Sequence, residues 1–352
     1  MLNYPTNRIS VLFFYLAASA SFIITLFSSV LVPSQFTRDS ELYANRISSA
    51  VTGYDDTYQV VANFYQFFGI TQNNLTLRIL AWFLFFGIIS IALRIRNVTF
   101  LNTSTFFASS IYFLLIPFYG SVLTKETFIG IFLIPYFLFK NAYPKSNSFL
   151  VPILLMLVYA IFLRNYYFIT LSFFFFYKIA GSRLRPGIIR ALSPIILLGI
   201  IATLEARLGV LSKIGQGDVF NIRMKIQMGL KFAANSRINQ DRSNSSLFQN
   251  IENYIQIWMQ LVFPYNLLQL SLYSFATFVI VVYISMTFTL PFIRARSFMP
   301  VEVLFLFSYF VVALIFEPDL GSYVRHSFPF LTFVARNSQV APIPKNPSSR
   351  AN

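Results

Sequence analysis

The sequence contains no cysteine and a single histidine among its 352 residues. The absence of cysteine excludes a disulfide framework, a thiolate metal site and a cysteine nucleophile. One histidine excludes the usual zinc clusters, which need several Cys or His ligands. Charged residues are also scarce, since Asp, Glu, Lys and Arg together make up 11% of the chain. These absences leave few ways to build a conventional soluble enzyme.

Apolar residues dominate what is present. They form 56% of the chain, with 43 Phe and 20 Tyr, and the mean hydropathy is +0.64. A soluble protein could not bury that much apolar surface, so a soluble globular enzyme, a disordered chain and a coiled coil are excluded. The composition predicts an all-α, polytopic integral membrane protein. The net charge of +15 then reflects topology rather than nucleic-acid binding, because cytoplasmic loops collect Lys and Arg.

About ten segments are long and apolar enough to be membrane spans, for which about 20 residues are needed. We read the first as an uncleaved anchor, because its apolar run is too long for a signal peptide. We expect one polytopic membrane domain over 1–341 and a disordered tail at 342–352. The expected spans are 10–32, 76–93, 103–119, 126–139, 149–163, 166–180, 188–205, 267–291, 300–316 and 326–336.

The distribution of charge predicts the orientation of these spans. With the N-terminus inside, the inner segments carry many Lys and Arg and no acid except Glu302 at the start of a span. The sequence therefore predicts an N-in, C-in topology with the other acids on or near the outer face. We assign the basic inner ends no role beyond orientation.

A long, basic outer loop is predicted at about 206–266. Within it, apolar residues recur at helical spacing over 247–262, and Ser246 with Gln249 fits a capping box. An amphipathic helix with Trp258 on its apolar face is expected in the membrane interface. The basic residues before it suit an anionic headgroup or a pyrophosphate, although simple contact with anionic lipid is an open alternative.

Asp39 and Glu41 follow the first predicted span. A carboxylate at the outer interface can act as a general base on an acceptor hydroxyl or can hold a metal. The alternative is an ordinary solvated loop in which Arg38 and Arg46 are the partners of these acids. Because carboxylates are few in each loop, we expect no metal and no cofactor.

Lys125 and Glu126 stand at the mouth of another predicted span. One of the two groups can point at a substrate while the other is neutralised nearby. The alternative is a helix start, with Thr124 as the N-cap and Glu126 in the first turn, where it is favourable to the helix dipole.

Arg164 lies between two aromatic, apolar runs with only Asn165 beside it. An arginine at that depth is costly unless it is paired or faces a polar cavity. Together with Arg325 and His326 it could neutralise a diphosphate, since the planar guanidinium meets two phosphate oxygens at once. The alternatives are an interfacial arginine at a tight hairpin and a histidine that serves only as a polar cap.

Three short motifs resemble the Wzy-like oligosaccharide repeat-unit polymerases of O-antigen and capsule clusters, and related polytopic transferases that use lipid-linked sugars. The resemblance is spread over most of the chain, and each motif is short. The motifs are Asp39-Ser40-x-x-Tyr43, Leu123-Thr124-Lys125-Glu126 and Gly321-Ser322-Tyr323-x-Arg325-His326-x-x-Pro329.

This resemblance implies a glycosyltransferase of the bacterial inner membrane. Its donor would be an undecaprenyl-diphosphate-linked oligosaccharide, and its acceptor a hydroxyl on a second lipid-linked repeat unit. A chain-length regulator is a further partner that the resemblance allows. The candidate diphosphate-binding residues are Arg164, Arg325 and His326, assisted by Lys125, and the catalytic candidates are Asp39, Glu41, Lys125 and Glu126.

Other functions remain open at this point. A flippase or transporter of lipid-linked sugars also needs basic groups for a diphosphate, but it should keep them in a central cavity between pseudo-symmetric halves. No internal repeat or matched pair of broken helices is visible here, which favours the enzyme. An O-antigen ligase or a single-sugar transferase needs the same groups as a polymerase. A membrane protein with a purely structural role is the remaining alternative.

Overall fold

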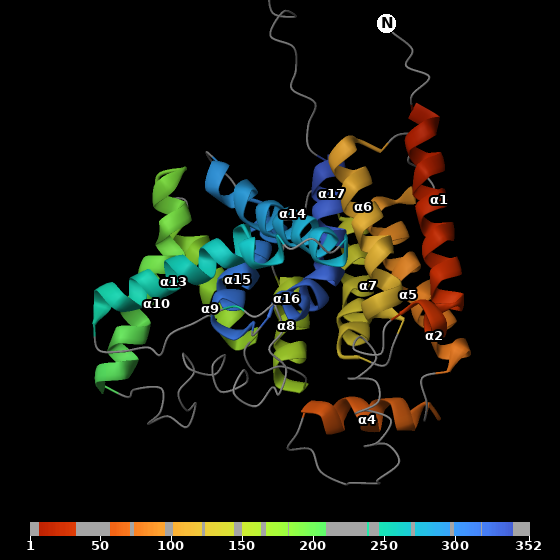
Figure 1. Ribbon diagram of the computed structural model, residues 1–352, viewed down its shortest axis with the longest axis horizontal. Helices are drawn as coiled ribbons and strands as arrows, with labels where there is room; N and C mark the ends of the chain where they lie inside the picture. Colours follow the sequence, from red (N-terminus) through yellow and green to blue (C-terminus); the bar gives the residue numbers. More distant parts are fainter. Residues whose placement is uncertain are drawn as a thin grey trace, which may run out of the picture. The chain divides into compact units, whose positions relative to one another are not determined.

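The computed structural model describes residues 7–32, 57–70, 74–95, 101–121, 124–143, 150–162, 167–181, 183–208, 238, 246–268, 272–295, 299–317 and 319–340. Within these ranges the regular secondary structure is helical, and no strand occurs (Figure 1). The predicted all-α class is therefore confirmed for the described part of the chain. The predicted tail at 342–352 lies outside it.

Among the described residues, three helices are long and apolar enough to cross a membrane. They are α5 (Leu75–Leu93), α10 (Ile188–Leu208) and α14 (Leu272–Arg294), the last over residues 274–294. Shorter apolar helices occur at Ser10–Leu26, Tyr167–Ala180 and Val301–Phe316. These helices support the expected membrane character of the chain. The count of ten spans and the N-in, C-in topology stay predictions.

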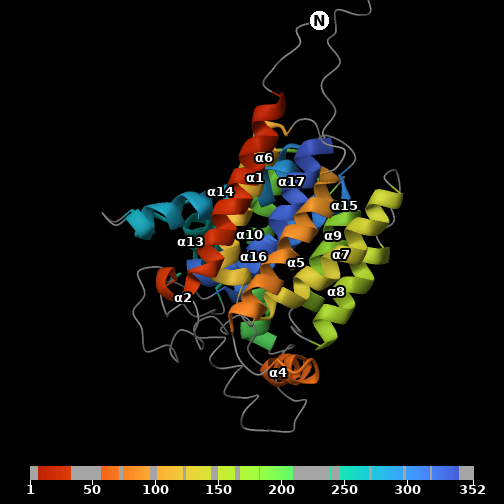
Figure 2. The same ribbon diagram turned by 90° about the vertical axis from the view of Figure 1, so that its right-hand side faces the viewer.

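The chain divides into two compact units, which we call unit 1 (Met1–Ser146 and Phe328–Asn352) and unit 2 (Asn147–Ser327). Figures 1 and 2 show their helices coloured along the sequence. Besides α5, unit 1 contains α1 (Asn7–Leu26), α2 (Ser28–Leu31), α4 (Thr57–Phe67), α6 (Thr103–Leu115), η3 (Ile116–Gly120), α7 (Glu126–Ala142), η6 (Phe328–Phe330) and α17 (Leu331–Val340). Besides α10 and α14, unit 2 contains α8 (Leu150–Phe162), α9 (Tyr167–Ala180), α13 (Leu247–Val262), η5 (Tyr265–Leu267), α15 (Val301–Phe316) and α16 (Leu320–Ser327).

Unit 1 is a bundle in which α17 packs on α6, α7 packs on α5, and α1 lies against both α5 and α6. Its centre is aromatic: the fully buried Phe85 ring lies 5.1 Å from that of Phe328, centroid to centroid. Gly120 makes this packing possible, because a Cβ there would lie 2.9 Å from the Phe85 ring. Tyr112 is also buried and donates a hydrogen bond of 3.0 Å to the carbonyl of Phe85.

A buried arginine joins three helices at one end of unit 1. Arg336 of α17 donates to Ala92 O of α5 at 2.9 Å, and to Asn141 Oδ1 and Lys140 O of α7 at 2.7 and 3.3 Å. Its guanidinium also lies over the Phe137 ring, 5.8 Å from the ring centroid. Because helix carbonyls in the last turn lack intrahelical donors, this arginine caps the ends of α5 and α7.

Unit 2 is built around α15, which is buried along nearly its whole length. Helices α9 and α14 pack against it, and α10 packs closely against α13. The rings of Phe292 and Phe307 stack with their centroids 4.0 Å apart, and Tyr177 contacts both at 5.1 and 5.0 Å. Apolar residues on every side of α15 produce this burial, as expected of a helix without a polar face.

A second buried arginine caps a helix end in unit 2. Arg190 of α10 donates through Nε to Leu184 O and through Nη1 to Phe292 O, both at 3.0 Å, and Nη1 also donates to Ala295 O. The guanidinium lies 5.5 Å from the Phe292 ring centroid. Arg190 and Arg336 therefore have a structural role that the sequence analysis did not assign to the basic helix ends.

One detail of the long outer loop differs from expectation. The helix predicted at 247–262 is present as α13, but Ser246 makes no side-chain capping hydrogen bond, so the predicted capping box is wrong. On this helix Asn250 is buried and donates a hydrogen bond of 2.9 Å to Thr203 Oγ1 of α10, while Phe248 is 83% exposed. Gly199 permits this contact, because a Cβ there would lie 2.6 Å from Ile251.

The last predicted span and the segment between the first two predicted spans also differ from expectation. Residues 326–336 do not form one helix, since α16 ends at Ser327, η6 follows and α17 begins at Leu331. Pro329 lies in η6 and has no N–H to donate, which explains the break. Conversely, α4 lies inside a segment that was expected to be a loop.

Candidate functional site

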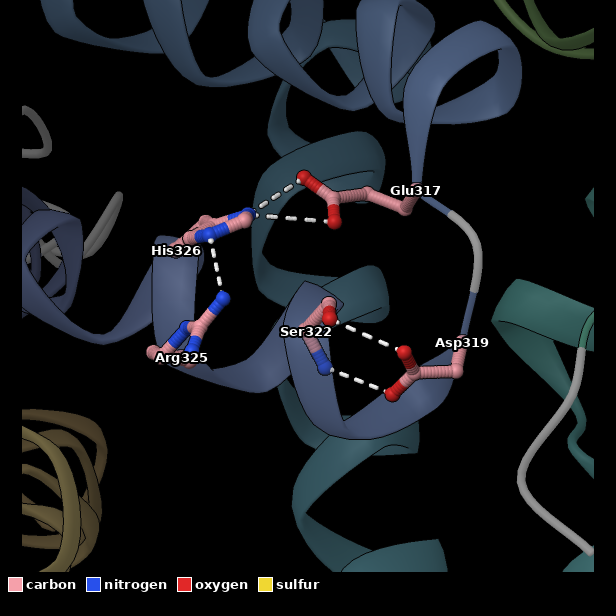
Figure 3. A network of polar contacts seen from close by, with 5 residues as sticks. All are labelled: Glu317, Asp319, Ser322, Arg325 and His326. Carbon is pink, nitrogen blue, oxygen red and sulfur yellow. Dashed lines mark hydrogen bonds and ion pairs between the residues drawn. The ribbon is translucent and has the colours of Figure 1, made fainter. Parts of the chain in front are cut away.

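The candidate site lies on α16, the short helix formed by the Gly-Ser-Tyr-x-Arg-His segment. Asp319, directly before this helix, accepts a hydrogen bond of 2.8 Å from Ser322 N through Oδ1 and one of 2.9 Å from Ser322 Oγ through Oδ2 (Figure 3). A carboxylate in this position satisfies backbone N–H groups that have no intrahelical partner. Asp319 therefore fixes where the helix begins.

His326 lies between a carboxylate and a guanidinium at the other end of α16. Its Nδ1 is 2.9 Å from Glu317 Oε1 and 3.1 Å from Oε2, and its Nε2 is 3.3 Å from Arg325 Nη2 (Figure 3). Glu317 and His326 are 2% and 7% exposed, whereas Arg325 is half-buried. The three side chains thus form a buried acid–imidazole pair with a more accessible cation beside it.

This geometry assigns different roles to the two ring nitrogens of His326. A carboxylate accepts hydrogen bonds, so the proton lies on Nδ1, and Nε2 is left to accept from Arg325. Glu317 therefore fixes the tautomer and the orientation of the ring. The arrangement can exchange a proton at Nε2 while Arg325 binds an anion, which is the chemistry needed at a departing phosphate.

Tyr323 holds α16 against the rest of unit 2. Its hydroxyl is 3.2 Å from Ser285 Oγ of α14, and Ser285 Oγ donates to Leu261 O of α13 at 2.5 Å. Tyr323 is fully buried, and this burial raises the pKa of its phenol well above the ordinary value. The hydroxyl therefore stays protonated at physiological pH and remains available for the contact that positions α16.

Lys125 and Glu126 belong to unit 1, at the start of α7. Lys125, not Thr124, is the N-cap residue, so the predicted cap is wrong, and Glu126 is in the first turn as expected. Thr124, Lys125 and Glu126 are all buried, with Glu126 only 1% exposed. A carboxylate in the first turn is favourable to the helix dipole, so this acid has a structural reason for its place as well as a candidate chemical one.

Three of the predicted site residues, Asp39, Glu41 and Arg164, lie outside the described residues. Of the other four, the structure brings Arg325 and His326 into contact, and it places Lys125 and Glu126 next to each other in the other unit. In the described ranges no group of three or more potential metal ligands occurs.

Glu317 is the residue of this site to which the sequence analysis assigned no role. A signal for it existed, because a lone histidine in an apolar chain needs a polar partner. The nearest preceding acids are Asp319 and Glu317, and the first of these caps α16. Which of the two reaches His326 depends on how the chain turns between α15 and α16, and helical periodicity does not specify that turn.

Comparisons with protein-family profiles, with curated proteins and with solved structures find no significant match to this chain.

Proposed function

We propose that this chain is a membrane-embedded glycosyltransferase that polymerises lipid-linked oligosaccharide repeat units on the outer face of the bacterial inner membrane. The observation that carries the proposal is the contact of His326 with both Glu317 and Arg325 on a segment that resembles a polymerase motif. The apolar helices α5, α10 and α14 support a membrane location for this chemistry.

The proposed reaction joins two lipid-linked saccharides. An acceptor hydroxyl attacks the anomeric carbon of the undecaprenyl-diphosphate-linked chain, and a new glycosidic C–O bond forms as the bond to the diphosphate breaks. The lipid diphosphate leaves with the bonding electrons, and the acceptor proton passes to a base. The protein must therefore neutralise the leaving diphosphate and supply a proton acceptor for the hydroxyl.

In this proposal Arg325 and His326 bind the leaving diphosphate. When a phosphate approaches, Arg325 turns from His326 Nε2 to the anion. The reason is that a guanidinium binds two phosphate oxygens more strongly than it binds a neutral imidazole. The freed Nε2 can then take up a proton from water, and the Glu317 carboxylate stabilises the imidazolium that forms until it donates this proton to the departing phosphate. Arg164 and Lys125 stay predicted helpers at the diphosphate, and Asp39 or Glu41 the predicted base for the acceptor.

The test is deletion of the gene in its native bacterium, with the surface polysaccharide resolved by gel electrophoresis. We expect the ladder of polymer lengths to collapse to core plus one repeat unit. Polymer retained on the lipid carrier would instead indicate a ligase. Undecorated core with repeats trapped inside would indicate a flippase, and an unchanged ladder would contradict the whole proposal.

A further inference from the structure

Helix α4 lies crosswise to α5 and α7, at the end of unit 1 where α7 begins (Figures 1 and 2). Its inner face is buried and contains Gln59, Val61, Ala62 and Tyr65, whereas Phe67 on the same helix is 83% exposed. The helix therefore covers something on one side only.

Helix α4 lies against the start of α7, next to the adjacent residues Lys125 and Glu126. The Tyr65 hydroxyl donates to Thr124 O at 3.2 Å, and Lys125 and Glu126 directly follow in the chain. Both charged residues are buried, at 9% and 1% exposure. Charged side chains at a helix terminus ordinarily face water, since burial costs them hydration. In the described arrangement, a bulky ligand cannot reach these two groups.

Side chains at one end of α7 make the described contacts between α4 and that helix. These contacts are aromatic: the ring centroids of Phe64 and Phe128 are 4.3 Å apart, and those of Tyr65 and Phe128 are 6.0 Å apart. Contacts of this kind, between side chains at the end of a bundle, can open locally without unfolding the helices beneath them.

The closed position also leaves one polar group unsatisfied. Gln59 is 4% exposed; its Nε2 donates to Asn63 Oδ1 at 2.8 Å, but its Oε1 is buried and accepts no hydrogen bond in the described structure. A buried acceptor without a donor is destabilising, and water or a ligand hydroxyl would remove that penalty. The closed state of α4 therefore leaves one hydrogen bond unmade that a state open to water could form.

We propose that α4 is a lid over Lys125 and Glu126, and that it must lift from Phe128 before any ligand reaches these residues. The inference rests on the proposed function only in treating the two residues as part of a reaction site. The lid itself is defined by its own contacts. In the lifted state, the Gln59 amide would offer both a donor and an acceptor, as a hydroxyl-bearing saccharide requires.

The absence of cysteine from the native chain makes the lid directly measurable. A Thr124→Cys reporter in the full-length protein in detergent is treated with a polar maleimide, and the rate of labelling is recorded. We expect slow labelling, a rise of at least tenfold when Phe64→Ala is added, and no change with the matched control Phe67→Ala. Equal rates in all three proteins, or a reporter labelled as fast as Phe67→Cys, would overturn the lid.

Gln59→Leu tests the same lid in the opposite direction, and it also serves if Phe64→Ala does not fold. Removing the unsatisfied amide should favour the closed position, so labelling of Thr124→Cys should slow severalfold. An increase in labelling would contradict the proposal, because the amide would then be stabilising the closed position.

The link to the proposed function is tested separately with Phe64→Cys and Phe128→Cys in one chain. A short, cleavable thiol cross-linker applied to cells should lock the lid and stop polymer growth, and a reductant should restore it. If labelling shows a lid but the locked protein still makes polymer, the lid stands and the use of Lys125 and Glu126 in the proposed reaction is wrong.

Discussion

Two sets of buried charged groups among the described residues differ in their partners. Arg190 and Arg336 donate only to neutral acceptors in the contacts described above, which are main-chain carbonyls and one amide oxygen. His326 instead contacts an acid and a base, Glu317 and Arg325. An arginine that donates to main-chain carbonyls joins helices, and a carbonyl cannot exchange a proton with it. Burial of charge is therefore not a sign of chemistry by itself, and the partner decides.

The largest effect should come from Arg325→Ala, which removes the cation beside His326. Loss of a positive group at a leaving diphosphate is expected to lower chain elongation by roughly 100-fold or more. The measurement is polymer length in a complemented deletion strain with protein level monitored. Arg185→Ala is the matched control, since Arg185 is exposed and outside the site. A normal ladder from Arg325→Ala would remove the residue from the proposed site.

Glu317 should behave as a positioning residue whose charge and hydrogen bond can be separated. Glu317→Gln keeps an oxygen for His326 Nδ1 but loses the charge, and Glu317→Ala loses both, so we expect a decrease of roughly 10-fold for Gln and roughly 100-fold for Ala. The check is the pH profile of elongation in membranes, which should differ between wild type and Gln. A residue that only stabilised the fold would lower activity without altering that profile.

The arginine caps should affect stability instead. Arg190→Ala leaves the carbonyls of Leu184, Phe292 and Ala295 without this donor, and we expect a loss of roughly 2–4 kcal/mol in the free energy of unfolding. Thermal unfolding in detergent measures it, and Arg336→Ala should give a comparable loss.

Unlike the variants at Arg325 and Glu317, Arg190→Ala and Arg336→Ala should leave chain elongation per folded molecule unchanged at low temperature. A loss of elongation at full stability would show that these arginines take part in function and would abolish the distinction.

The smallest expected effect concerns Tyr65, whose neutral hydroxyl joins α4 to the start of α7, and it is absent at ordinary pH. Burial raises the pKa of this phenol from 10.0 to about 12. Below pH 10 the phenol is neutral whether α4 is docked or lifted, so docking is unaffected. Between the two values the lifted state ionises and the docked state does not, so docking weakens by about 1.4 kcal/mol per pH unit.

The mobility of a spin label at Phe67→Cys reports this change. It should rise above pH 10 in the protein with Tyr65 and show no such step with Tyr65→Phe. A step of equal size in both proteins would assign the pH response to another group.

The helices were predictable wherever apolar runs are long. The segment predicted at 76–93 corresponds to α5 at Leu75–Leu93, and that at 188–205 to α10 at Ile188–Leu208. Tertiary contacts decide what periodicity leaves open. Asn250 lies on the polar side of α13 and is nevertheless buried, because Thr203 bonds it and Gly199 lets the helices approach. α4 was missed because its aromatic residues stand in a segment too short and too polar for a span.

The sequence by itself determined the all-α class, and its apolar fraction of 56% predicts the membrane character that α5, α10 and α14 support. It also placed Arg325 and His326 next to each other and at the end of an apolar segment. Only the tertiary structure decided that Glu317 rather than Asp319 contacts His326, that Arg190 and Arg336 cap helix ends, and that Tyr65 of α4 bonds Thr124 before α7. The physical reason is that hydropathy is a property of each segment, whereas a hydrogen-bond partner is set by how separate segments meet.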